Sequence, residues 1–394
     1  MKVHHVSKFA LALAVLGATV GAAAAQPELK LGVMAILSGP GSAWGVAIEH
    51  AAELAAEDYN KDGGIDVGGT KYTIKLVTYD TKYRPDEALS AVNRMINQDG
   101  VKFILGPVGS SEAVAIQDIT TRAKVLTMTN AWSPRVLGPQ LPYQFRMSNT
   151  PNEFGPAQIA WINSYLKLKK VGGLYPNDEL GQQGAKQIEA AYGASGAQAL
   201  SEMFERNRTD FVPLITRLVN EGVDAIELDG NSPVTTGLIV KQSRGIGFKG
   251  PLVRTGGPAE DEILQVAGPE ASEGIYLNSP VNPDDPAVKA FNDRYVATFK
   301  TKMNGFAPTF YDGARIVLDG IRKAGSVDDI DAVAKAIEGM KDFPGLQGKL
   351  SWTGAKDYGA DRQIDSPFYV VQIQSGQSRP VASCSRAACE TIKK

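Results

Sequence analysis

The sequence predicts an α/β protein with two doubly wound parallel-sheet lobes. The nearly continuous apolar run at 29–37 is typical of a strand buried on both faces. The amphipathic pattern that follows at 46–60 indicates a helix. This strand–helix order recurs along the chain, which indicates parallel sheets covered by helices. The 394 residues suit two domains at roughly 150 residues each.

The alternation falls into two series. The first comprises expected strands at 29–37, 72–79, 103–105 and 125–128 and expected helices at 46–60, 85–97 and 110–122. The second comprises strands at 171–175, 199–204, 225–228 and 252–253 and helices at 156–168, 181–192, 211–220 and 234–244. Three helices at 286–303, 309–324 and 327–340 and a late strand at 368–373 then break the rhythm. A helical run after two series indicates that the chain returns to complete the first lobe.

Residues 1–25 have the pattern of a secretory signal. Lys2 and Lys8 precede an apolar run at 9–20, and Ala23–Ala25 supply the small residues before cleavage at Gln26. The run is shorter than the ~20 residues that span a bilayer. We therefore expect export across the cell membrane. Because export permits disulfides, we expect Cys384 and Cys389 to pair, with two free thiols as the alternative.

Composition excludes several classes of function. The formal net charge is −2 and becomes −4 without the two signal lysines, which argues against nucleic-acid binding. His50 is the one histidine outside the signal, and we expect it to be a solvated helix residue. Neither G-x-x-x-x-G-K-[ST] nor G-x-S-x-G is present. We expect no catalysis, no metal and no cofactor.

Candidate binding residues follow the expected strands, because ligands of open parallel sheets bind beyond the carboxyl ends of the strands. Ser110 and Ser111 begin a helix, where a hydroxyl either caps the helix or holds an anion; the residues alone favour capping. Trp44 stands where a dinucleotide fingerprint needs its third glycine, so it lines a pocket or packs in the core. Trp132 and Ser133 combine an apolar wall with a hydroxyl, although turn chemistry also explains this segment.

A family resemblance spans nearly the whole chain after the signal. The segments that carry it, in order, are Leu37–Pro40, Ala52–Ala55, Ala91–Arg94, Ile104–Pro107, Phe145-Arg146, Tyr311–Gly313, Gly345–Gly348 and Pro367–Val370. In their order and spacing the chain resembles the type I periplasmic solute-binding proteins of branched-chain amino-acid ABC importers, the leucine/isoleucine/valine-binding group.

The resemblance implies three crossovers between the lobes, which together form a three-segment hinge. Lobe 1 would comprise 26–147 and 280–350, and lobe 2 would comprise 148–279 and 351–394. It implies hinge closure around a small carboxylate ligand and delivery to an ABC permease in the inner membrane. We expect a monomer that performs no chemistry.

The resemblance also assigns site residues in the first lobe. Ser110 and Ser133 match hydroxyls that bind the ligand carboxylate, and Ala131 matches a carbonyl that accepts from the ligand ammonium. Trp44 matches an aromatic wall. Ser111 and Trp132 flank these positions.

The second lobe departs from the family pattern. The candidate ligand-binding residues of this lobe are Tyr175, Leu180, Asn231 and Gly256. Leu180 replaces an aromatic residue of the family, and Asn231 replaces a tyrosine. Gly256 replaces the carboxylate that balances the ammonium. A buried ammonium without a counter-charge is costly, and Asp229 is a possible but poorly aligned substitute. The carboxylate half of the site is therefore kept, and the ammonium half is changed.

These departures leave the ligand open. Branched-chain amino acids are the family default, and an aromatic or other amine-free carboxylate is the alternative. An exported two-lobed enzyme and a sensor ectodomain are further classes, the first weakened by the missing motifs and the second by the lack of a membrane segment or a fused signalling domain.

Overall fold

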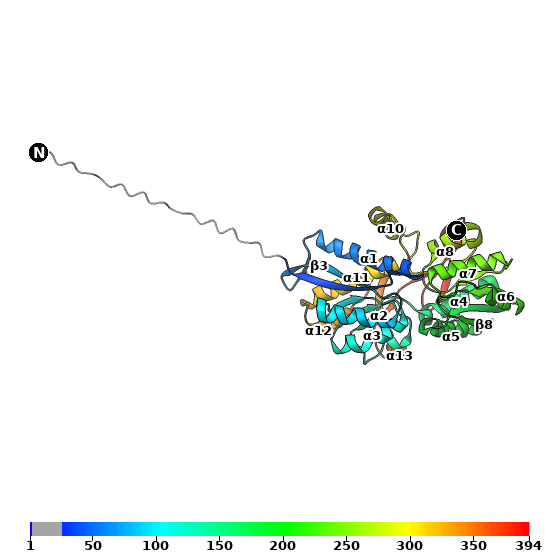
Figure 1. The fold of residues 1–394 in the computed structure, drawn as a ribbon, viewed down its shortest axis with the longest axis horizontal. Coiled ribbons are helices and arrows are strands. Elements are labelled where there is room, and N and C mark those ends of the chain that lie inside the picture. The colour runs from blue at the N-terminus through cyan, green and yellow to red at the C-terminus, as the bar shows by residue number, and fades with distance from the viewer. Residues whose placement is uncertain (2–25, 394) are drawn as a thin grey trace.

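The computed structural model describes residue 1 and residues 26–393. Apart from Met1, the expected signal segment lies outside the described residues. Within residues 26–393 the strands form two sheets, and helices cover both, so that two lobes lie side by side (Figure 1). The predicted α/β class with two lobes is confirmed. No helix among the described residues is long and apolar enough to cross a membrane.

The first sheet has nine strands among the described residues, and its central strands are parallel. In spatial order they are β12 (Phe343–Gly345), β13 (Gly348–Thr353), β14 (Gln363–Asp365), β6 (Gln144–Arg146), β5 (Leu126–Thr129), β4 (Phe103–Leu105), β1 (Glu28–Ala35), β3 (Thr70–Asp80) and β2 (Ile65–Val67). β1 lies between β3 and β4, and its Leu31 and Val33 are fully buried, as the apolar run predicted.

Helices of this lobe come from both halves of the chain. They are α1 (Ser42–Asn60), α2 (Pro85–Arg94), α3 (Ser110–Arg122), α10 (Pro286–Phe299), α11 (Phe306–Ala324), α12 (Ile330–Glu338) and the short α13 (Ala355–Tyr358), with a π-helical turn at Met95–Asp99 and a 3₁₀ turn at Pro134–Val136. α11 packs along α1, and Phe310, Val317 and Ile321 share one core with the first sheet. The helical run after the second series therefore returns to the first lobe, as predicted.

The second sheet has eight strands among the described residues. In order they are β17 (Cys389–Thr391), β16 (Gln377–Cys384), β15 (Phe368–Gln374), β11 (Tyr276–Ser279), β10 (Leu252–Arg254), β9 (Ala225–Glu227), β7 (Lys170–Pro176) and β8 (Gln198–Phe204). Its helices are α4 (Pro151–Leu166), α5 (Glu179–Ala194), α6 (Val212–Asn220), α7 (Pro233–Gly245), α8 (Glu260–Ala267) and α9 (Pro269–Ser272). β7 to β11 are parallel, and β15 to β17 add an antiparallel edge.

The chain changes sheet three times. It leaves the first sheet after β6, returns for β12 to β14, and enters the second sheet again at β15. The last change lies between Asp365 and Phe368, later than the boundary expected at 350/351, so residues 351–365 belong with the first lobe. β13 and β14 are three to six residues long, too short for a periodic pattern to predict.

Two side-chain expectations can be placed in this fold. Cys384 and Cys389 form a disulfide between the paired ends of β16 and β17. His50 differs from the expected solvated residue. It is half-buried, stacks on Phe299 with ring centroids 3.7 Å apart, and shares a 2.8 Å hydrogen bond with the Tyr295 hydroxyl. Burial lowers the pKa of His50. Through its contacts with Phe299 and Tyr295, His50 packs α1 against α10.

Candidate functional site

Ser110 connects two loops at the carboxyl ends of β4 and β5. Its buried Oγ accepts from the backbone N–H groups of Trp132 and Ser133, each at 3.1 Å. The N-terminus of α3 is closed by Glu112, whose side chain accepts from the Gly109 N–H at 2.9 Å, and Ser110 is not the cap. A hydroxyl that accepts two hydrogen bonds still has its own hydrogen to donate. Ser110 is thus suited to an anionic ligand group.

Arg146 holds the same loop from the other side. Its Nη1 donates to the carbonyl oxygens of Ala131, Trp132 and Ser133 at 3.3, 3.3 and 3.0 Å. The N–H groups of the loop therefore face Ser110, and its carbonyls face a fully buried guanidinium. Because Arg146 already engages the Ala131 carbonyl, that oxygen is a weaker acceptor for a second cation than the resemblance implied.

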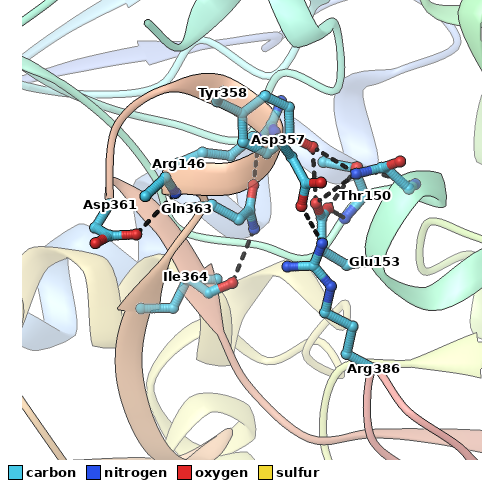
Figure 2. A network of polar contacts seen from close by, with 11 residues as sticks. Arg146, Thr150, Glu153, Asp357, Tyr358, Asp361, Gln363, Ile364 and Arg386 are labelled. Atoms are coloured by element: carbon cyan, nitrogen blue, oxygen red, sulfur yellow. Dashed lines mark hydrogen bonds and ion pairs between the residues drawn. The ribbon is translucent and has the colours of Figure 1, made fainter. Parts of the chain in front are cut away.

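Arg146 also ties this loop to the crossovers (Figure 2). Its Nε donates to Gln363 Oε1 at 2.5 Å, and its guanidinium lies 4.6 Å from the centre of the Tyr358 ring. The Tyr358 hydroxyl donates to Glu153 on α4 at 2.7 Å. Arg386 of the second lobe pairs with Asp357. The loop that carries Trp132 and Ser133 is thereby linked through Arg146 to the crossover segments.

Two indoles from the first lobe meet the second. The Trp44 Nε1–H donates to the Pro258 carbonyl at 2.9 Å. Trp132 packs edge-on against Phe154, with ring centroids 5.7 Å apart, and belongs to the apolar cluster of the second lobe. A Cβ on Gly256 would lie 2.5 Å from Phe154 and 2.7 Å from Trp132, so these rings fill the space that a side chain at 256 would need.

The loops of the second lobe are held by two buried charged groups. Glu227 Oε1 accepts from the N–H groups of Leu228, Asp229 and Thr255 at 2.8–3.1 Å. Its Oε2 accepts from the hydroxyls of Thr255 at 2.5 Å and Tyr192 at 3.0 Å. Burial and the charge of Asp229 raise the pKa of Glu227 to about 7. Glu227 thus fixes the two loops that follow β9 and β10.

Arg254 also holds the loops that follow β9 and β10. Its guanidinium donates to the carbonyls of Gly257, Leu228 and Asn231 at 2.7, 3.2 and 2.8 Å and to the Thr236 hydroxyl at 2.5 Å. All three of its nitrogens are committed to these acceptors, although its charge remains close to Asp229.

Asp229 is the unsatisfied group in this framework. Its side chain is fully buried, and neither carboxylate oxygen finds a hydrogen-bond partner within residues 26–393. Burial raises the pKa of Asp229 to about 6, a rise limited by Arg254 and by the N–H groups of Gly230 and Gly256, which face the carboxylate.

Of the other positions expected in the second lobe, Tyr175 and Leu180 lie in its apolar core, and Asn231 is a buried polar residue. Leu180 packs in the same cluster as Trp132. The Tyr175 ring folds back over its own strand, 2.1 Å from where a Cβ on Gly173 would stand. The Asn231 amide donates to the carbonyls of Leu174 and Leu228 at 2.8 and 3.0 Å, which shapes the turn after β9. Tyr175 and Asn231 therefore have structural contacts in place of the contacts expected with a ligand.

The lobes are closed on each other. Ser133 Oγ donates to Glu179 of α5 at 2.8 Å, and Arg135 lies 3.6 Å from the same carboxylate. Arg206 lies over the Tyr83 ring at 4.6 Å. The cavity beside Trp132 at the hinge measures about 30 Å³, room for about one water molecule. A larger ligand reaches Ser110 only when the lobes separate.

The structure thus gathers Trp44, Ser110, Ala131, Trp132 and Ser133 around the meeting of the lobes, with Gly256 opposite. Ser111, the neighbour of Ser110 on α3, is half-buried.

Sequence reasoning assigned no role to Arg146 or Asn130. The Asn130 amide is buried, with neither its nitrogen nor its oxygen paired in the described part of the chain. An arginine inside the apolar segment 143–147 was the available signal for a buried polar network. In the described ranges, no group of three or more His, Cys, Asp or Glu is placed to hold a metal ion.

Comparisons with known proteins agree with this architecture. The profile of the periplasmic binding protein family matches residues 28–378. The Leu/Ile/Val-binding protein BraC3 of Rhizobium johnstonii is 26% identical over 330 residues, covering 83% of this chain and 88% of the relative.

Two solved structures are also similar. The branched-chain amino acid transporter substrate binding protein LivJ of Streptococcus pneumoniae, in complex with isoleucine, is 25% identical with a TM-score of 0.78, covering 93% and 100% of the two chains. The solute binding protein of an ABC transporter from R. palustris, in complex with benzoate, is 18% identical with a TM-score of 0.79, covering 93% and 98%. At that identity the second likeness shows the shared fold.

Proposed function

The chain belongs to the periplasmic binding protein family, and we propose that it is the extracytoplasmic solute-binding component of an ABC importer. It clamps a small carboxylate ligand between its lobes, with a branched-chain or related amino acid as the first candidate. The observation that carries this proposal is the buried Ser110 hydroxyl, held by two backbone N–H groups and left with a hydrogen to donate. The Leu/Ile/Val-binding relatives and the isoleucine-bound neighbour support the ligand class.

Capture proceeds by hinge closure. In the open form the ligand carboxylate accepts from Ser110 at the positive N-terminal end of α3. Closure then forms the bond from Trp44 to Pro258, and Ser133 donates to Glu179 when no ligand carboxylate takes that hydrogen. Opening must break these bonds and the packing of Trp132 on Phe154.

The remaining parts of the proposal follow from this role. The protein is exported by a cleaved signal at 1–25, works in the periplasm as a monomer and hands its ligand to an inner-membrane permease. It releases the ligand unchanged, without metal or cofactor. The proposed ligand contacts are Trp44, Ser110, Ala131, Trp132 and Ser133 in the first lobe.

A second candidate ligand is an aromatic or other amine-free carboxylate. The edge-on pair of Trp132 and Phe154 against Gly256 favours it, because flat rings suit an aromatic acid. The benzoate-bound neighbour shares the scaffold.

Mass spectrometry of the ligand that co-purifies with the protein, followed by calorimetry, tests the proposal. We expect saturable one-to-one binding of leucine or a related amino acid, and no binding of the corresponding amide, which lacks the carboxylate. Binding of the amide as tightly as the acid, or conversion of any small carboxylate to a product, would overturn the proposed function.

A further inference from the structure

One buried carboxylate of the second lobe lacks a hydrogen-bond partner within residues 26–393, although Arg254 and the N–H groups of Gly230 and Gly256 stabilise its charge in part. Asp229 follows β9 and is fully buried, and neither carboxylate oxygen has a hydrogen-bond partner in the described part of the chain. Glu227, two residues earlier, accepts five hydrogen bonds, so the two acids of this loop differ completely in how they are satisfied. Unpaired buried carboxylates are costly and uncommon, and each one in a native fold needs an explanation.

The nearest cation does not supply the missing partner. All three nitrogens of Arg254 donate to carbonyls or to Thr236. Glu227 is also close to Asp229, and Arg254 interacts in addition with the buried Glu260 and Glu262, so carboxyl groups outnumber the one guanidinium in this region. A further positive charge would reduce this excess of acid.

The surroundings of Asp229 place it at the ligand site. A Cβ on Gly256 would lie 2.8 Å from Asp229 Oδ1 and 2.7 Å from Trp132, so carboxylate and indole border the same space. A Cβ on Gly184 would lie 3.1 Å from Oδ2. Glycines therefore lie against both carboxylate oxygens, where any other residue would place a Cβ in close contact with them. Trp132 belongs to the loop whose N–H groups bind Ser110, which connects this acid with the carboxylate anchor.

The same geometry shows why an acid cannot stand at position 256. Phe154 would lie 2.5 Å from a Cβ there, closer than side-chain atoms approach. The rings of Phe154 and Trp132 therefore exclude a carboxylate at 256, and Asp229 Oδ1 reaches the edge of that position from the neighbouring loop.

We propose that Asp229 is the counter-ion of the ligand ammonium group and that it selects amino acids over amine-free acids. The assignment rests on the proposed function, because it presumes that Ser110 holds the ligand carboxylate. An amine-free acid would bring a second anion beside Asp229 with no cation to balance it. The ammonium of an amino acid would instead donate the charge-assisted hydrogen bonds that the Asp229 carboxylate lacks.

Calorimetry with matched ligand pairs tests this proposal. The pairs are leucine with 4-methylpentanoate and phenylalanine with 3-phenylpropanoate, which differ only in the amine. We expect the unaltered protein to prefer the amino acid of the pair that it binds by about 30-fold or more, the effect of a buried charge pair. In Asp229→Asn we expect that preference to collapse, with amine-free affinity unchanged or increased. Asp210→Asn, which removes an exposed acid from the same lobe, is the control and should keep the preference.

Folding of the variant has its own readout. Because Asp229 is an unpaired buried charge, ligand-free Asp229→Asn should melt no lower than the unaltered protein at pH 7.5. A preference for the amine-free acid in the unaltered protein, or equal loss of both ligands in Asp229→Asn, overturns the inference while the proposed function stands. Binding of neither member of either pair, nor of any other carboxylate, overturns the proposed function and this inference with it. If Asp229→Asn does not fold, the preference of the unaltered protein for the amino acid over the amine-free acid still tests the inference.

Discussion

The two lobes differ in how the buried polar groups of their binding-site loops are hydrogen-bonded. In the first lobe, Ser110 and Arg146 hold both sides of the loop 131–133, and the backbone groups of that loop are paired. In the second lobe, Glu227 and Arg254 hold the loops equally well, yet Asp229 between them has no partner within residues 26–393. Beside the loop 131–133 the first lobe leaves the uncharged Asn130 amide and Nη2 of Arg146 unpaired within residues 26–393, whereas the second lobe leaves a buried carboxylate unpaired.

This difference suggests a division of labour. A rigid anchor with a hydroxyl hydrogen to donate binds any small carboxylate, so the first lobe supplies affinity for the class. The Asp229 carboxylate would discriminate among carboxylate ligands, because an amine-free acid leaves this carboxylate without a cation. Changes in the first lobe should therefore weaken all ligands together, and changes in the second should alter preference, as the Asp229 experiment tests.

The largest expected effect concerns the rigidity of the first lobe. Arg146→Met removes the donor from three loop carbonyls and from Gln363. We expect the free energy of unfolding to fall by about 3–5 kcal/mol, because a buried acceptor that loses its donor costs roughly 1–3 kcal/mol. Chemical denaturation measures the change, with Arg379→Met on an exposed strand position as the control. A loss no greater than that of the control would show that the loop keeps its shape without Arg146.

The next effect separates anchor from selector. Ser110→Ala removes the hydrogen-bond donor to the ligand carboxylate, and we expect affinity to fall by about 1–3 kcal/mol for amino acids and amine-free acids alike. Calorimetry with the same matched pairs measures both. Ser111→Ala, at the half-buried neighbour, should leave affinity nearly unchanged. Unequal losses within a ligand pair would contradict the assignment of Ser110 to the carboxylate.

The pH dependence of binding probes the second lobe alone. Burial raises the pKa of Asp229 to about 6, so the carboxylate is ionised at pH 7.5 and mostly protonated at pH 5. Glu227, Arg254 and Tyr175 are the titratable groups coupled to it. Because an ammonium pairs with the ionised form, amino-acid affinity should fall about tenfold between pH 7.5 and pH 5. Amine-free acids should bind no worse at pH 5, and a parallel fall for both would argue against a charge pair.

Ligand-free stability should follow the opposite trend. The pKa of each of Asp229 and Glu227 lies above the value it has in the unfolded chain, so the folded protein binds protons more tightly. These two groups therefore stabilise the fold below about pH 4 and lose that contribution as pH rises through about 6 to 7. An amino acid should reverse this trend by holding Asp229 ionised.

Much of this fold could be predicted from the sequence, and the reason lies in particular elements. The apolar run that became β1 and the amphipathic pattern of α1 are long and periodic. β13 and β14 are short antiparallel strands, so the third crossover at 365–368 was misplaced at 350.

The candidate site was predicted unevenly for a related reason. Ser110, Ser133 and Trp132 follow strands directly, and local order alone brings their loops together. Asp229 and Arg146 depend on which groups fold around them. No local sequence pattern predicts that the rings of Phe154 and Trp132 fill the space beside Gly256. The sequence therefore shows that an acid is present at Asp229, whereas only the fold shows that its carboxylate is buried without a hydrogen-bond partner.

The smallest expected effect concerns closure, which both lobes share. Trp44→Phe keeps an aromatic wall and removes the N–H that donates to Pro258 across the cleft. We expect affinity to fall by about 0.5–1.5 kcal/mol for both members of a ligand pair, because one interlobe bond is lost from the closed form only. Trp352→Phe is the matched control, since its N–H donates to Ile337 within the first lobe at 2.7 Å. It should lower stability and spare affinity. If Trp44→Phe changed the preference within a pair, the indole would contact the ligand amine, and selection would no longer belong to the second lobe alone.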